Sequence, residues 1–385
     1  MENFTYHNPV KIVFGKGMIK EISTLIPSGK RVMITYGGGS IKRNGVYDQV
    51  RQALKDRSVV EFGGIEANPD YDTLMKGVAL AREEGVDFLL SLGGGSVLDG
   101  TKFMAAAIKY EGDDPWDMLV KGEAVHSALP LGAVLTLPAT GSEMNGFTVI
   151  SRRALKEKRA FGNPLLYPLF SVLDPETTFT LPDRQVKNGI VDTFVHVAEQ
   201  YLTVRESSPL QDRQAEAILL TLIEEAPKVI DAPKDYNVRA NLMWAATQAL
   251  NGLIGCGVPQ DWATHMIGHE VTALHDLDHG QTLAVILPAL LTHQKEAKRA
   301  KLLQYAERVW NLREGSDDEK AGQAIEKTAA FFRSLGVATT LKEYGVGSEN
   351  FGIIGKRFDD RGMALGEKGA IKSREVVEIL NLCLG

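Results

Sequence analysis

The sequence predicts an α/β domain followed by an all-helical domain. Up to about residue 180, short apolar runs alternate with segments of helical periodicity, which indicates a mostly parallel sheet covered by helices. After residue 181 apolar residues recur three and four positions apart in long segments, and strand signals almost disappear. We therefore expect an α/β domain over residues 1–180 and a helical domain over residues 181–385.

In the first part, each expected strand is a short run of apolar residues. The expected strands are 31–35, 58–62, 86–92, 131–137 and 170–173. The segments between them show helical spacing of apolar residues, and the expected helices are 45–57, 71–84 and one that begins at Val97. In the second part, the expected helices include 190–202, 215–230, 238–253, 262–274 and 321–335.

Composition excludes several classes of protein. The chain of 385 residues carries 43 Lys and Arg against 49 Asp and Glu, so it has no surplus of cations for nucleic acid. It lacks an apolar run of about 18 residues, so we expect no membrane span. Cys256 and Cys383 form no CxxC pair, and the first residues do not resemble a signal peptide. A cytoplasmic protein is the natural expectation.

A glycine-rich loop at 93–96 lies between an expected strand and an expected helix. Glycine lets a backbone approach a phosphate closely, and the free N–H groups of a helix start attract an anion. The usual dinucleotide fingerprint would need glycine at Leu98, so it is absent. A tight turn without a ligand is the alternative. Asp99, one turn into the helix, could bind a carboxamide or hydroxyl, or simply favour the helix dipole.

A second glycine loop, at 37–40, favours NADP(H) over NAD(H). Many NAD sites place a carboxylate at the end of such a strand, where it would repel a 2′-phosphate. Here the loop offers glycines and Ser40, with Lys42 and Arg43 close behind. The alternative is a surface turn with solvated cations. A third loop, at 136–143, has small residues and hydroxyls at the end of a strand, although such residues also simply make turns.

The candidate metal ligands form two helical pairs and one further histidine. Asp192 and His196 are spaced i, i+4 on an expected helix, as are His265 and His269, and His279 follows after an Asp-rich turn. A buried Asp–His hydrogen bond without metal is the alternative for the first pair. Three imidazoles and one carboxylate suit Fe(II), Zn(II) or a similar divalent ion.

Two familiar metalloenzyme classes do not fit this pattern. A zinc protease would need glutamate directly after the first histidine, and the chain has Met266 there. Zinc alcohol dehydrogenases with cysteine ligands are excluded because Cys256 and Cys383 lack suitable spacing.

These motifs, taken in order, resemble the iron-dependent alcohol dehydrogenase family over nearly the whole chain. The resemblance rests on FxxxNPVKIVFGKG at the start, GGGSVLD at 93–99, LPATGSE at 137–143, the Asp192–His196 pair and the segment from His265 to His279. Further stretches, such as TYGGGS at 35–40 and GVPQDWATHMIGHE at 257–270, are similar to the butanol-dehydrogenase-like branch, which includes bacterial NADPH-dependent aldehyde reductases.

The resemblance implies an N-terminal dinucleotide-binding domain in a dehydroquinate-synthase-like two-domain architecture, with the active site in the cleft between the domains. It implies four metal ligands: Asp192, His196, His265 and His279. It places His269 in the site as a catalytic histidine that does not bind the metal directly. The implied cofactor-binding residues are Gly38, Ser40, Asn68, Gly94, Gly95, Ser96, Asp99, Thr136, Thr140, Asn145, Lys158 and Thr180.

The expected reaction is hydride transfer between NADP(H) and an aldehyde or primary alcohol, assisted by one divalent ion, Fe²⁺ or Zn²⁺. The proton donor stays open among His269, a water chain and a ribose hydroxyl. The rival is a dehydroquinate-synthase-like lyase, which uses NAD and a metal but needs a cluster of cations that is missing near the metal motifs. The expected partner is a small molecule, with no nucleic acid and no membrane. An edge strand at Lys11–Phe14 suggests a homodimer.

Overall fold

The computed structural model describes residues 1–204 and 207–385, which form two compact units. One unit comprises residues 7–186 and 232–251 and contains the sheet. The other comprises residues 1–6, 187–231 and 252–385 and consists of helices and loops. We call them the sheet unit and the helical unit. The α/β and all-helical classes expected from the sequence are thus both present.

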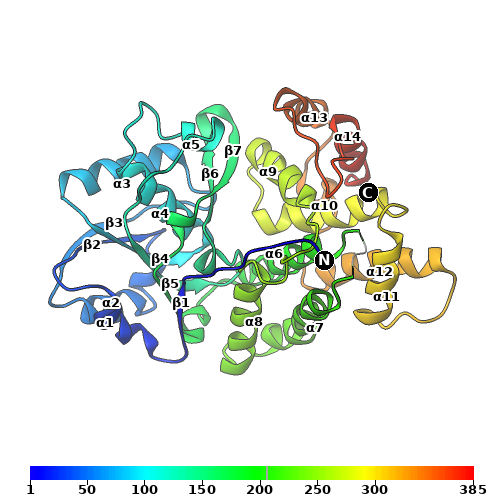
Figure 1. The fold of residues 1–385 in the computed structure, drawn as a ribbon. Helices are drawn as coiled ribbons and strands as arrows, with labels where there is room; N and C mark the ends of the chain where they lie inside the picture. Colours follow the sequence, from blue (N-terminus) through cyan, green and yellow to red (C-terminus); the bar gives the residue numbers. More distant parts are fainter. Residues whose placement is uncertain (205–206) are drawn as a thin grey trace. The chain divides into compact units, whose positions relative to one another are not determined.

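The sheet unit is built on six parallel strands in the order β1-β8-β5-β4-β2-β3 (Figure 1). The strands are β1 (Lys11–Phe14), β2 (Arg31–Tyr36), β3 (Ser58–Phe62), β4 (Phe88–Gly94), β5 (Leu131–Leu137) and β8 (Phe170–Leu173). The central strands β4 and β5 are buried along almost their whole length. Their nearly continuous apolar sequences are typical of parallel strands with both faces covered.

Helices cover both faces of this sheet, as Figure 1 shows. They are α1 (Ile22–Leu25) and α2 (Val46–Ala53) on one face, and α3 (Tyr71–Glu83) and α4 (Gly95–Ile108) on the other. Each face of the sheet has its own hydrophobic core, and alternate side chains of β2 point into one or the other. Val32 and Ile34 pack with α2, whereas Met33 packs with α3 and α4. The period of two along the strand therefore divides the apolar residues between two layers.

Two parts of the sheet unit were not expected from the sequence. The first is an antiparallel hairpin of β6 (Phe147–Arg152) and β7 (Glu157–Gly162), which lies next to α4. The second is helix α8 (Tyr236–Ala249), which was expected as a helix over residues 238–253 of the helical domain but belongs to the sheet unit. A short helix, α5 (Asp117–Val120), lies beside β7.

The helical unit is built mainly from helices. They are α6 (Asp183–Tyr201), which begins in the sheet unit, α7 (Pro209–Asp231), α9 (Ala263–His275), α10 (His279–His293), α11 (Arg299–Arg308), α12 (Asp317–Ser334), α13 (Phe351–Asp360) and α14 (Ser373–Leu382). Buried residues occupy every position of α6 from Gly189 to Tyr201, so this helix forms the centre of the unit. Among the described residues, no helix combines the length and apolar character that a membrane crossing requires.

Candidate functional site

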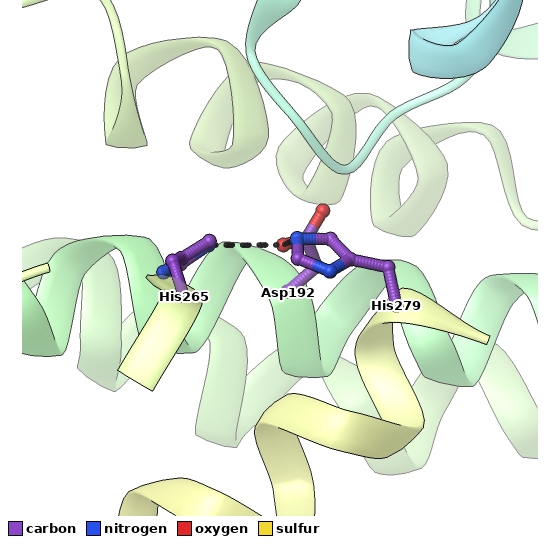
Figure 2. Close-up of side chains that lie close together, drawn as sticks. All are labelled: Asp192, His265 and His279. Carbon is purple, nitrogen blue, oxygen red and sulfur yellow. Dashed lines mark ion pairs between the residues drawn. The ribbon is translucent and has the colours of Figure 1, made fainter. Parts of the chain in front are cut away.

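Three side chains from three helices of the helical unit converge on one point. Asp192 comes from α6, His265 from the first turn of α9 and His279 from the first position of α10. One potential ligand atom from each residue lies within 4.8 Å of the others. Figure 2 shows His265 and His279 approaching the Asp192 carboxylate from two sides. A group of this kind can hold a metal ion.

The distances around Asp192 fit a shared divalent ion. Its Oδ1 lies 3.7 Å from His265 Nε2, 3.6 Å from His279 Nε2 and 3.5 Å from His196 Nδ1. These separations exceed ordinary hydrogen bonds. They are close to the spacing of about 3.4 Å between donors that surround a tetrahedral ion with bonds of about 2.1 Å. The Asp192 and His196 side chains are each only 5% exposed, so the donors are shielded from water.

Local packing explains why the histidine of α10 is followed by glycine. A side chain at Gly280 would place its Cβ 2.6 Å from the carbonyl oxygen of Asn188 on α6, so only glycine allows this close approach. The Asn188 side chain donates a hydrogen bond of 2.8 Å to Asp278, the residue before the helix. Together these contacts hold the start of α10 against α6, one turn from Asp192. The glycine that follows His279 in the sequence is therefore required by the packing of α10 against α6.

The other two histidines predicted for the site lie beside this group. The ring of His196 stacks on that of His265, with centroids 4.5 Å apart. His269 lies one turn along α9, and its ring centroid is 5.4 Å from that of His279 and 6.4 Å from that of His265. The structure thus brings all five predicted residues together. His196 and His269 are outside the group of three whose potential ligand atoms all lie within 4.8 Å of one another, although Nδ1 of His196 is 3.5 Å from Asp192 Oδ1.

Electrostatics distinguish two of these histidines. Burial lowers the pKa of His196 to about 4, against the opposing charge of Asp192, so its imidazole is neutral. Burial also acts to lower the pKa of His265, but the charges of Glu199 and Asp192 outweigh it and raise the pKa to about 9. Metal binding at His265 would therefore displace a proton, as is general for imidazole ligands.

Sequence reasoning missed Glu199, although a signal was present. Asp192, His196 and Glu199 are spaced i, i+4 and i+7, so they form one stripe on α6. Glu199 is buried, and its carboxylate contacts Nδ1 of His265 at short range.

The two glycine loops of the sheet unit flank the point where the strand order reverses. The loop after β2 leads through α2 to β3 on one side, whereas the loop after β4 leads through α4 to β5 on the other. In open α/β sheets, ligands bind outside the carboxyl ends of strands at such a point. Both loops contact Val97: an added Cβ at Gly37 would be 3.6 Å from it, and one at Gly93 would be 2.6 Å from it.

The glycines of the second loop are required by close packing against the third loop. An added Cβ at Gly94 would lie 2.8 Å from Leu137, and one at Gly95 would lie 2.4 Å from Thr140. The segment after β5 thus lies directly against the start of α4, and the structure brings Gly95, Ser96 and Thr140 together. Thr136 is buried in β5 itself.

Several of the polar residues expected to bind a cofactor are engaged within the protein. Both carboxylate oxygens of Asp99 accept hydrogen bonds, from Ser142 Oγ at 2.6 Å and from the Val149 N–H at 3.0 Å. Asn145 donates to Gly141 and Leu250 and accepts from buried Lys102.

Three further residues expected to bind the cofactor, Asn68, Lys158 and Thr180, form hydrogen bonds within the protein. Lys158 donates to Asn68 at 2.8 Å, and Thr180 accepts from Asn44 at 3.2 Å.

The first glycine loop differs from expectation because a carboxylate is present. Glu61, in β3, forms an ion pair of 2.8 Å with Lys42, and Lys42 also lies 4.8 Å from the ring centre of Tyr36. The sequence did not reveal this group because β3 lies about twenty residues further along the chain. Gly38 lies in open space, with no atom within 4 Å of an added Cβ, and Ser40 begins a short 3₁₀ turn.

Comparison with known proteins places both units in one family. Residues 9–175 match the family model for iron-containing alcohol dehydrogenases, and residues 186–383 match the C-terminal model of the same family. The chain therefore belongs to the iron-containing alcohol dehydrogenase family. The resemblance found in the sequence is confirmed, and the lyase alternative is not favoured.

Particular relatives are similar over their whole length. The chain is 58% identical to the NADPH-dependent aldehyde reductase YqhD of Escherichia coli (strain K12), covering 98% of this chain and 99% of that protein. The crystal structure of E. coli YqhD superposes with a TM-score of 0.97 at 56% identity, covering 99% of this chain and 98% of that one. A probable NADH-dependent butanol dehydrogenase of Bacillus subtilis (strain 168) is 43% identical, covering 99% of each chain.

Proposed function

We propose that this chain is a metal-dependent oxidoreductase that works mainly as a broad-specificity, NADPH-dependent aldehyde reductase. The observation that carries the proposal is the group of Asp192, His265 and His279, in a chain of the iron-containing alcohol dehydrogenase family. The identity of 58% with a protein named as an NADPH-dependent aldehyde reductase supports the choice of cofactor and the direction of the reaction.

We assign the metal to Asp192, His196, His265 and His279. Asp192 contributes the single negative charge of this set, and the three imidazoles contribute neutral donors, which is a set that accepts Fe²⁺ or Zn²⁺. Nδ1 of His196 lies 3.5 Å from Asp192 Oδ1, which supports its inclusion in the set. A divalent ion held there supplies Lewis-acid polarisation of a carbonyl group, and a reduced nicotinamide supplies the hydride.

The residues of the sheet unit are assigned to cofactor binding. Gly94, Gly95 and Ser96 precede or begin α4, whose first N–H groups suit a pyrophosphate. Gly38 and Ser40 are assigned to the 2′-phosphate, and Asn68, Asp99, Thr136, Thr140, Asn145, Lys158 and Thr180 to the remainder of the cofactor. Asp99 and Asn145 would act chiefly by holding the loop at 136–146, because their polar atoms already have partners in the protein.

His269 is assigned to catalysis. It lies beside the metal group without belonging to it. Its imidazole is therefore placed to hold or relay a proton near the substrate oxygen.

The proposal also includes a cytoplasmic location and a homodimer. Two buried cysteines without a disulfide are consistent with a reducing compartment. Strand β1 is an edge of the sheet, hydrogen-bonded only to β8 among the described strands, so its free edge could pair with a second copy. Light scattering would test the dimer directly.

A substrate panel tests the proposed function. Protein stripped of metal and reloaded with Fe²⁺ or Zn²⁺ alone is assayed with aldehydes and alcohols, using NADPH and NADH. We expect aldehyde reduction to exceed alcohol oxidation and NADPH to be preferred. Activity that does not depend on metal, or equal activity without any nicotinamide, would contradict the proposal.

A further inference from the structure

A buried carboxylate on α6 accepts hydrogen bonds from the N-terminus of α9, and no part of the proposed reaction uses it. Glu199 lies on α6, one helical turn beyond His196, and its side chain is 2% exposed. Its Oε1 accepts a hydrogen bond of 2.5 Å from the N–H of Thr264, and its Oε2 accepts one of 3.3 Å from the N–H of His265. The same Oε2 contacts Nδ1 of the His265 ring.

These contacts fix both the backbone and the ring of His265. The first N–H groups of a helix have no partners within the helix, and a carboxylate there is favoured by both hydrogen bonding and the helix dipole. Glu199 thus binds α9 to α6 at the residue that must approach Asp192. The backbone N–H of Asp261, in the segment leading into α9, also donates a hydrogen bond of 2.9 Å to the backbone carbonyl of Glu199. This bond strengthens the link between α6 and α9.

The contact to Nδ1 determines which ring nitrogen can bind a metal. A carboxylate can only accept, so the proton of a neutral His265 resides on Nδ1. The lone pair is then on Nε2, which is the nitrogen that lies 3.7 Å from Asp192 Oδ1. Among the described residues Nε2 has no hydrogen-bond partner, so it remains available. Carboxylates that orient histidine ligands in this way raise metal affinity in many proteins.

We propose that Glu199 is a positioning residue for the metal, which holds His265 in the tautomer and orientation that binding requires. This inference rests on the proposed metal site. Glu199 does not contact the reacting atoms and is not itself a ligand. It acts through His265, and its second task is to anchor the start of α9.

The test compares Glu199→Gln with a matched control. Glutamine has the same shape, but its amide group can donate to Nδ1 and so favours the proton on Nε2. Glu216→Gln makes the same chemical change at another buried carboxylate of the helical unit, which accepts from Tyr201, Gln304 and Arg308 and, within the described part of the chain, from no imidazole. Metal affinity is measured by competition with a chelator, and the visible spectrum of the Co²⁺-loaded protein reports the geometry of the ligands.

We expect Glu199→Gln to weaken metal binding by about 10- to 100-fold and to change the Co²⁺ spectrum. Activity should return as the metal concentration is raised, because the ligands themselves are intact. Glu216→Gln should leave affinity and spectrum unchanged. Wild-type affinity and spectrum in folded Glu199→Gln would overturn the inference, and so would an equal loss of affinity in Glu216→Gln.

Two further variants keep the test decisive. If Glu199→Gln does not fold, Glu199→Asp replaces it: the shorter side chain withdraws the carboxylate from Nδ1, so affinity must again fall, and wild-type affinity would overturn the inference. His265→Ala separates the two proposals. If His265→Ala keeps its metal, the proposed metal site is wrong. If it loses the metal while Glu199→Gln binds normally, only the role of Glu199 is wrong.

Discussion

In the helical unit the candidate metal site depends on side chains. In the sheet unit the candidate cofactor site depends mainly on the backbone of its glycine-rich loops. Asp192, His265 and His279 bring charge and imidazole nitrogens to one point. Gly94 and Gly95 instead have no room for any side chain, because Leu137 and Thr140 lie against them. The helical unit therefore depends on which functional groups are present. The sheet unit depends on how closely its backbone segments can approach one another.

This difference predicts different responses to mutation. Removing a functional group should abolish metal binding in the helical unit while the fold survives. In the sheet unit, an added side chain should change the preference between NADPH and NADH only moderately, because cofactor binding there is distributed over many N–H groups and hydroxyls. The following predictions test that contrast.

The largest effect is expected from the proposed ligands. Asp192→Ala, His196→Ala, His265→Ala and His279→Ala should each lose bound metal and lower turnover by about 1000-fold or more, because Lewis-acid stabilisation supplies several kcal/mol. Elemental analysis and steady-state kinetics measure both effects. His275→Ala, at the end of α9 and outside the metal group, is the control and should keep both. A ligand variant with full metal content and wild-type turnover would remove that residue from the set.

A smaller effect is expected at His269. His269→Ala should retain the metal and lower kcat by about 100-fold, or change its pH dependence, because a proton relay contributes to rate without carrying the ion. Metal content and the pH profile of kcat are the measurements. Loss of the metal in this variant would instead make His269 a ligand, and the distinction between His265 and His269 would need revision.

The smallest effect is expected in the first glycine loop. Gly38→Asp should shift preference from NADPH towards NADH by about 10- to 100-fold, mainly through the KM of the cofactor, because a carboxylate repels a 2′-phosphate and accepts ribose hydroxyls. Gly38 has space for a side chain, so the backbone need not move. Gly38→Ala is the control and should leave the ratio unchanged. An unchanged ratio in Gly38→Asp would place the 2′-phosphate elsewhere.

Much of the fold could be predicted because its signals are local. The apolar run of β4, the glycines that follow it and the i, i+4 pairs of α6 and α9 are each visible within about ten residues. Local signals also indicated the candidate metal ligands, because two of the pairs have helical spacing and His279-Gly280 directly follows an Asp-rich turn.

What could not be predicted depends on contacts between distant segments. Glu61 reaches Lys42 from a neighbouring strand, and α8 joins the sheet unit although nothing in its periodicity indicates this. The hairpin of β6 and β7 was missed because its sequence shows no clear alternation: Phe147 is exposed whereas Thr148 is buried, and β7 begins with three charged residues. Glu199 was missed for a different reason: its spacing was visible, but only the fold shows that it meets His265.

X-ray absorption spectroscopy of the bound metal counts its ligands without relying on activity, so it is the sharpest test of the four assigned ligands. We expect one ion per chain with three imidazole nitrogens and one carboxylate oxygen at about 2.0–2.2 Å. In His196→Ala the signal of the bound metal should be lost. A wild-type spectrum with two imidazoles or fewer, or one with sulfur in the first coordination shell, would contradict the assignment of Asp192, His196, His265 and His279.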